Sequence, residues 1–136
     1  MKYLVDANVL SEITRPEPCA AVVEWLRKHE RDLIVTPIVL GEIEYGIGLT
    51  ASSRKRKELE LWFEEGMQRL RVIDLDAGTA SVWAALLVRL KKKGRAMPVK
   101  DSLIAASALQ HQLTIVSRNI CDFQNAGVPL INPFDE

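Results

Sequence analysis

Cysteine is scarce in this chain of 136 residues. The two that are present, Cys19 and Cys121, lie far apart and form no CxxC pair. Disulfide-stapled secreted domains are rich in cysteine, and many zinc sites are recognised by closely spaced cysteine or histidine pairs. Neither signature is present, so we expect a protein of a reducing, cytoplasmic compartment.

Long apolar runs and the common nucleotide-binding motifs are absent as well. The apolar run at the N-terminus is interrupted by Asp6 and is too short for a signal peptide. No other run approaches the roughly 18 residues of a membrane span. The chain contains neither G-x-G-x-x-G nor G-x-x-x-x-G-K-[ST], which argues against dinucleotide and P-loop sites.

An excess of positive charge is missing too, because 18 Lys and Arg are balanced by 18 Asp and Glu. A neutral molecule does not attract nucleic acid through its overall field. Local patches remain available at residues 54–57 and 89–95, which are rich in Lys and Arg. Solvated helix ends have the same composition, so these patches are candidates for phosphate contacts rather than evidence of them.

The remaining composition is that of one globular domain. Hydrophobic residues make up 48% and charged residues 26% of the chain, and 136 residues fit a single core. Residues 1–136 are therefore interpreted as one domain.

Short apolar runs alternate with helix-like segments along this domain. Strands are expected over 3–5, 33–35, 72–75 and 114–116, with a short edge strand over 128–131. Helices are expected from Asn8 to Ile13, around 22–28, and over 37–47, 53–70, 77–93 and 98–109. Strands that alternate with helices predict an α/β fold with a mainly parallel sheet.

Four carboxylates are expected at one edge of this sheet. Asp6 follows the first strand and Asp122 lies just beyond the fourth, while Glu42 and Asp101 come early in helices entered near the same edge. Ligands of open parallel sheets bind at the carboxyl ends of the strands. Glu42 is the most informative of the four, because its helix is otherwise apolar and an unpaired buried carboxylate is costly.

Such a cluster indicates a metal. Carboxylates repel one another, and a cluster with no Lys or Arg in register is usually neutralised by a hard cation. Oxygen ligands without Cys or His favour Mg²⁺ or Mn²⁺, which activate water for attack on a phosphodiester. Two alternatives stay open on these residues alone. Asp6 and Asp101 can act at helix N-termini and Asp122 can be a turn residue. An acidic cleft can also accept a phosphoryl group on aspartate, as in response-regulator receivers.

Five segments carry a resemblance to a known family. They are residues 4–12 (LVDANVLSE), 41–47 (GEIEYGI), 101–108 (DSLIAASA), 117–123 (SRNICDF) and 127–134 (GVPLINPF). Together and in this order they resemble the PIN-domain family, specifically the VapC/FitB-like toxins of bacterial toxin–antitoxin operons. The resemblance spans nearly the whole chain and implies a three-layer α/β sandwich, in which a mainly parallel sheet of four to five strands is flanked by helices.

The resemblance also implies an acidic metal site. It maps onto the same four carboxylates, Asp6, Glu42, Asp101 and Asp122, and implies Mg²⁺ as the ion with Mn²⁺ as a substitute.

Three further positions match or depart from the family pattern. Ser117 and Asn119 correspond to a Thr-Arg-Asn run and are expected to position the metal ligands or the scissile phosphate. Position 7 is usually threonine and is Ala7 here, so a hydroxyl near Asp6 is missing.

By the same resemblance, we expect a Mg²⁺-dependent endoribonuclease that cleaves cellular RNA of the tRNA or rRNA class. It is expected to act as a toxin that a cognate antitoxin from the same operon neutralises, and to form a homodimer and a hetero-oligomer with that antitoxin. The alternative is a catalytically weak PIN-like module that binds RNA or protein. The apolar stripe with Trp62, Phe63 and Met67 is more typical of a core than of an interface, although the resemblance implies that paired helices here can form the homodimer and antitoxin surface.

Overall fold

A computed structural model of the chain describes residues 2–135. Within these residues, the strands are β1 (Tyr3–Val5), β2 (Leu33–Val35), β3 (Arg71–Val72), β4 (Thr114–Val116) and β5 (Leu130–Ile131). The α-helices are α1 (Ala7–Glu12), α2 (Ala20–Lys28), α3 (Pro37–Gly48), α4 (Ser53–Met67), α5 (Ala77–Lys92) and α6 (Val99–His111). Short 3-10 helices cover Glu30–Asp32, Ile120–Asp122 and Pro133–Asp135.

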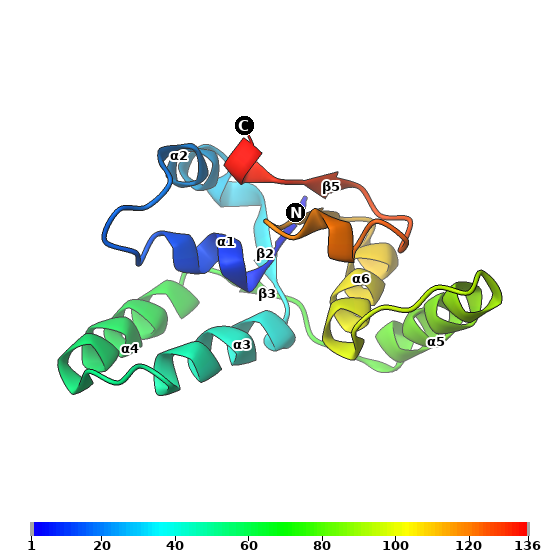
Figure 1. Ribbon diagram of the computed structural model, residues 1–136, viewed down its shortest axis with the longest axis horizontal. Helices are drawn as coiled ribbons and strands as arrows, with labels where there is room; N and C mark the ends of the chain where they lie inside the picture. The colour runs from blue at the N-terminus through cyan, green and yellow to red at the C-terminus, as the bar shows by residue number, and fades with distance from the viewer. Residues whose placement is uncertain (1, 136) are drawn as a thin grey trace.

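The strands form one parallel sheet in the order β3-β2-β1-β4-β5. Tyr3 of β1 lies opposite Leu33 on one side and Thr114 on the other, so β1 is the central strand. The chain winds outward from β1 to β3 and then crosses back to β4, which makes the β1/β4 boundary the switch point of the sheet. Helices α1 to α4 lie on one side of the strands, and α5 and α6 on the other (Figure 1). The predicted α/β fold with a mainly parallel sheet is confirmed.

The central strands are buried on both faces. Leu4, Val5, Ile34, Ile115 and Val116 are each fully inaccessible to solvent. A sheet covered on both sides by helices needs apolar side chains at every strand position. This is why the central strands occur in the sequence as short, mainly apolar runs and not as an alternating pattern. No helix within residues 2–135 has both the length and the apolar character needed to cross a membrane.

Several element boundaries differ from the prediction, and three of these differences have a local physical reason. The first helix begins after Asp6, whose Oδ1 accepts the N–H of Ala7, so Asp6 and not Asn8 is the N-cap. The third strand covers Arg71–Val72 instead of 72–75, because β2 ends at Val35 and offers no further pairing. The α4 helix ends at Met67 instead of residue 70, since the chain turns when Arg69 and Leu70 donate to the carbonyl of Gly66.

A capping box fixes the start of α5 and ties it to α6. Asp76 Oδ1 accepts the N–H of Thr79 at 2.9 Å, and Thr79 Oγ1 accepts the N–H of Asp76 at 3.1 Å. Gln110 of α6 donates to the same Asp76 oxygen at 3.1 Å. Gly78 leaves room for this contact, because a Cβ there would lie only 2.9 Å from Gln110 Nε2. These hydrogen bonds, with that from the Thr79 N–H the strongest, lower the pKa of Asp76 from 3.8 to about 2.

We expect Asp76→Ala to melt below the wild type at neutral pH, with a pH-dependent gap. A depressed native pKa adds stability that is fully present above the unfolded-state value of 3.8 and is lost as the pH falls through about 2. The gap between the two thermal midpoints, measured by circular dichroism, should narrow over that window. Asp76→Asn keeps a capping oxygen without the charge and serves as the control. A gap that is constant down to the acid end would contradict the expectation.

Candidate metal centre

Asp6 is the most firmly held of the four candidate carboxylates. It directly follows β1, and its backbone N–H donates to Val116 O of β4 at 2.9 Å. Its side chain accepts the Ser117 hydroxyl at 2.7 Å and the Asn8 amide at 3.3 Å, both on Oδ2. The residue is only 7% exposed. Strands β1 and β4 therefore present this carboxylate at the switch point of the sheet.

Ser117 orients Asp6 from the end of β4. Its side chain is fully buried, and its Oγ accepts the Asn119 N–H at 3.1 Å while donating to Asp6. Asn8 completes this network, because its amide nitrogen donates to Ser117 Oγ and its Oδ1 accepts the N–H of Arg118. The Asn119 residue is exposed, and only its backbone takes part in these bonds.

Glu42 and Asp101 lie on α3 and α6, which pack against each other. Lys100, the neighbour of Asp101, donates to Glu42 Oε2 at 2.8 Å. The sequence interpretation assumed a cluster without a cation in register, and this was wrong. Lys100 is thus the residue that sequence reasoning missed, although its adjacency to Asp101 could have drawn attention to it.

The charges of this region act on one another. Burial raises the pKa of Asp101, and the negative charges of Asp6, Asp122 and Glu42 raise it further, against the opposing effect of Lys100. The hydrogen bond to Glu42 raises the pKa of Lys100. Asp122 contributes from an exposed position in the 3-10 helix Ile120–Asp122. The fold therefore brings the four predicted carboxylates within electrostatic reach.

The donor set suits a hard divalent cation, but the side chains are not gathered around one point. Within residues 2–135, no three Asp, Glu, His or Cys side chains lie close enough together to ligate a single ion. Glu42 supplies the observation that favours a cation, because its Oε1 is buried and has no hydrogen-bond partner in this part of the chain. Carboxylate oxygens are the ligands that Mg²⁺ and Mn²⁺ prefer.

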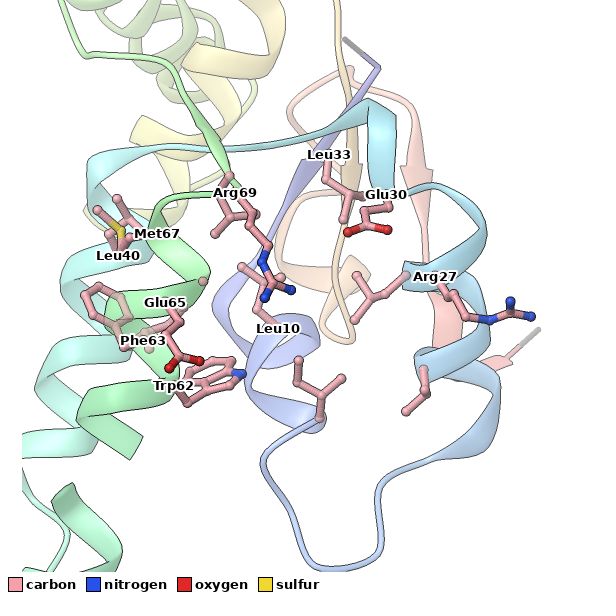
Figure 2. A pocket seen from close by; sticks show the side chains of 16 residues that line it. Leu10, Arg27, Glu30, Leu33, Leu40, Trp62, Phe63, Glu65, Met67 and Arg69 are labelled. Atoms are coloured by element: carbon pink, nitrogen blue, oxygen red, sulfur yellow. The ribbon is translucent and has the colours of Figure 1, made fainter. Parts of the chain in front are cut away.

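An apolar groove of about 490 Å³ lies beside this region, between α1, α2, α3 and α4. Leu10 and Trp62 border it from α1 and α4, and Arg69 extends into it from the segment after α4 (Figure 2). A smaller hollow of about 370 Å³ shares Ile43 and Trp62 with the groove and is bordered by Glu42. Trp62, Phe63 and Met67 pack partly against the core and also line the groove, so the expected core role describes only one side of this stripe.

The two basic segments are partly engaged within the fold. Arg54 and Arg56 form ion pairs with glutamates one turn later, at 3.8 and 3.7 Å. Arg89 donates to the carbonyl of Ala126. The side chains left exposed for other contacts are those of Lys55, Lys57, Lys91, Lys92, Lys93 and Arg95.

Known proteins resemble this chain over almost its whole length. A sequence profile of the PIN domain matches residues 3–127. Toxin FitB of Neisseria gonorrhoeae is 31% identical over 137 residues, which cover 98% of this chain and 99% of that protein. The tRNA(fMet)-specific endonuclease VapC of Shigella flexneri is 27% identical over 128 residues, 93% of each chain. A crystal structure of FitAcB from Neisseria gonorrhoeae superposes with a TM-score of 0.93 at 30% identity, covering 98% of this chain and 99% of that one.

Proposed function

The chain belongs to the PIN-domain family, and we propose that it is a Mg²⁺-dependent endoribonuclease that acts as the toxin of a toxin–antitoxin pair. The names of its relatives, a toxin and a tRNA-specific endonuclease, support this function. The matches cover 98% of this chain and 99% of toxin FitB, and 93% of this chain and of the VapC relative, so the likeness is not confined to a short segment.

The observation that carries the proposal is the position of Asp6. A buried carboxylate at the switch point of a parallel sheet lies where such folds bind ligands. Ser117 and Asn8 both donate hydrogen bonds to its Oδ2, which fixes the orientation of the carboxylate. Its negative charge contributes to the raised pKa of Asp101 on α6.

In this proposal, Asp6, Glu42, Asp101 and Asp122 hold Mg²⁺, and Mn²⁺ can replace it. When bound, such an ion neutralises phosphate oxygens and lowers the pKa of water so that it can attack phosphorus. Ser117 acts through Asp6 by fixing its rotamer. Asn119, exposed beside Ser117, is placed to orient the scissile phosphate.

RNA would bind through local contacts with the exposed basic side chains, because a molecule with a formal net charge of zero does not attract RNA through its overall field. Lys55, Lys57 and the lysines at 91–93 are the candidates, and lysine contacts to phosphate position RNA without reading its sequence. We propose a substrate of the tRNA or rRNA class. The name of the Shigella flexneri relative supports tRNA.

Purified protein incubated with total RNA should cleave it at discrete sites with Mg²⁺ present and leave it intact with excess chelator. Mapping the new ends by sequencing identifies the substrate class. Addition of Mn²⁺ after chelation should restore the same cuts, because the all-oxygen donor set accepts both ions. Binding of RNA without cleavage in either metal would support the alternative, a catalytically weak binding module.

The antitoxin is proposed to occupy the apolar groove. A folded monomer does not need an open hollow of about 490 Å³ lined by leucine, isoleucine and aromatic side chains. An apolar segment that fills it would reach Glu42 through the adjoining hollow, which begins at Ile43 and Trp62. An arginine or lysine at that point of the antitoxin would pair with the carboxylates and inhibit by occupying the site.

Assembly beyond the monomer is part of the same proposal. Tyr45, Leu49 and Leu61 on and near α3 and α4 are 70%, 67% and 60% exposed and lie outside the groove. A homodimer that also binds the antitoxin would give these side chains partners. Light scattering during gel filtration, with and without antitoxin, measures the stoichiometry.

A further inference from the structure

Lys100 makes an ion pair with Glu42, one of the proposed metal ligands. Its Nζ lies 2.8 Å from Glu42 Oε2, and the two residues are 58 positions apart in the sequence. The side chains are 50% and 25% exposed. Glu42 Oε1, the other oxygen of the same carboxylate, is buried and has no hydrogen-bond partner within residues 2–135. The ammonium group of Lys100 therefore provides a partner for Oε2 and leaves Oε1 without one among the described residues.

Lys100 is under the electrostatic influence of several side chains that are proposed to hold the metal. Glu42, Asp101 and Asp6 all act electrostatically on its ammonium group. Among the residues that the structure describes, Lys100 is the one cation within ion-pair distance of any of the four candidate ligands. With Glu42 turned toward Lys100, the carboxylates are not close enough together to ligate one ion.

We propose that Lys100 is an internal counter-ion, which holds Glu42 and offsets carboxylate repulsion in the metal-free protein and which an arriving divalent cation must displace. The inference rests on the proposed function, because it takes Glu42 as a metal ligand. Lys100 acts through Glu42 and is a positioning residue. Two cations drawn to one acidic cluster repel each other, and the coupling is reciprocal: a metal weakens the ion pair, and the ion pair weakens metal binding.

Lys100→Met tests this coupling, because methionine keeps most of the length of the side chain and removes the charge. Mn²⁺ should bind this variant about tenfold to thirtyfold more tightly than the wild type, which is the effect of the repulsion between a unit charge and a divalent ion about 4 to 6 Å apart in water. In chelator, the variant should melt below the wild type because the carboxylates lose their counter-ion. Titration calorimetry with MnCl₂ and thermal melting measure the two effects, which have opposite signs.

Two variants complete the design. Lys100→Arg keeps the charge and should restore both the wild-type affinity for Mn²⁺ and the wild-type midpoint. Lys28→Met removes one positive charge from the exposed end of α2, which carries none of the four carboxylates, and should leave Mn²⁺ affinity unchanged.

The outcomes separate the two proposals. Tighter Mn²⁺ binding in Lys100→Met alone, together with the lower midpoint in chelator, supports the counter-ion. Equal or weaker binding in Lys100→Met, with clear binding by the wild type, overturns the inference and leaves the proposed function standing. A wild type that shows no Mn²⁺ binding overturns the proposed function and, with it, this inference.

Discussion

Asp101→Asn is expected to lower RNA cleavage by about 10²-fold or more, because a metal site and its ligands act as a unit. Asparagine keeps the volume of the side chain and removes the charge that holds a divalent ion. Asp101 is suited to this test because its side chain accepts no hydrogen bond from the residues that the structure describes, so the substitution breaks no network there. Cleavage rates are measured on the RNA identified by end mapping.

Stability in chelator gives the same variant a second, independent readout. Burial and neighbouring carboxylates raise the pKa of Asp101 in the native state. Because the native state favours the protonated carboxyl group, protonation of Asp101 stabilises the folded protein. This stabilisation is complete below the unfolded-state pKa and is lost as the pH rises through the native pKa. Ionised Asp101 therefore destabilises the metal-free protein at neutral pH, and Asp101→Asn should melt above the wild type in chelator. The advantage should shrink in acid.

The metal reverses this order. Mn²⁺ or Mg²⁺ should raise the midpoint of the wild type by mass action on the native state and raise that of Asp101→Asn much less. Asp74→Asn is the matched control, because Asp74 is exposed and lies just past β3, at the far end of the same sheet. It should keep wild-type cleavage and the wild-type response to metal. Full cleavage by Asp101→Asn would remove Asp101 from the ligand set.

Asp6 could not serve as the clean test. Its Oδ2 accepts hydrogen bonds from both Ser117 and Asn8, and its Oδ1 caps α1. In Asp6→Asn, the new NH₂ group would face a hydrogen-bond donor at either oxygen position, so a buried hydrogen bond would be lost. The variant would therefore lose stability together with activity. The carboxylate that best marks the site is therefore also part of the fold.

The sheet was predictable because its chemistry is local. Strands β1, β2 and β4 are short, mainly apolar runs that are largely buried, and each is followed at once by a polar residue, Asp6, Thr36 or Ser117. Parallel strands place those residues at one edge whatever the connecting helices do. For this reason, the neighbourhood of the candidate site could be predicted without knowledge of the helix packing.

The state of Glu42 could not be predicted in this way. Its ion pair depends on how α3 packs against α6, which brings together residues 58 positions apart. Adjacent residues on a helix point about 100° apart, so the position of Lys100 beside Asp101 does not tell which of them faces Glu42. An expectation based on the carboxylates alone therefore described the charges of the site and missed its counter-ion.

The groove escaped prediction for a related reason. The apolar stripe of α4 indicates that one helix face is covered, but it does not say how completely. Here Trp62, Phe63 and Met67 are only partly buried, and the same side chains line an open hollow between four helices. An apolar helix face is expected to be covered by other protein atoms, and a single chain does not always cover the whole face.

Val23→Glu is expected to weaken antitoxin binding by at least about tenfold. The new carboxylate would have to give up its hydrating water when the antitoxin covers this apolar surface. Val23 lies on α2, lines the groove and is 37% exposed. The variant should fold normally, because the new carboxylate meets solvent in the free protein, and Arg27, one turn later, already pairs with Glu24. RNA cleavage should be unchanged, because α2 carries none of the candidate metal ligands.

Val88→Glu is the matched control for this variant. Val88 is on α5, is 53% exposed, lies outside the groove and also precedes a basic residue by one turn, Lys92. Affinity for the protein encoded beside this gene, measured by biolayer interferometry, should fall for Val23→Glu and not for Val88→Glu. In cells that co-express this partner, Val23→Glu should arrest growth where the wild type and Val88→Glu are neutralised. Wild-type affinity in Val23→Glu would place the antitoxin on another surface, because an unpaired charge in a filled apolar groove cannot be neutral to binding.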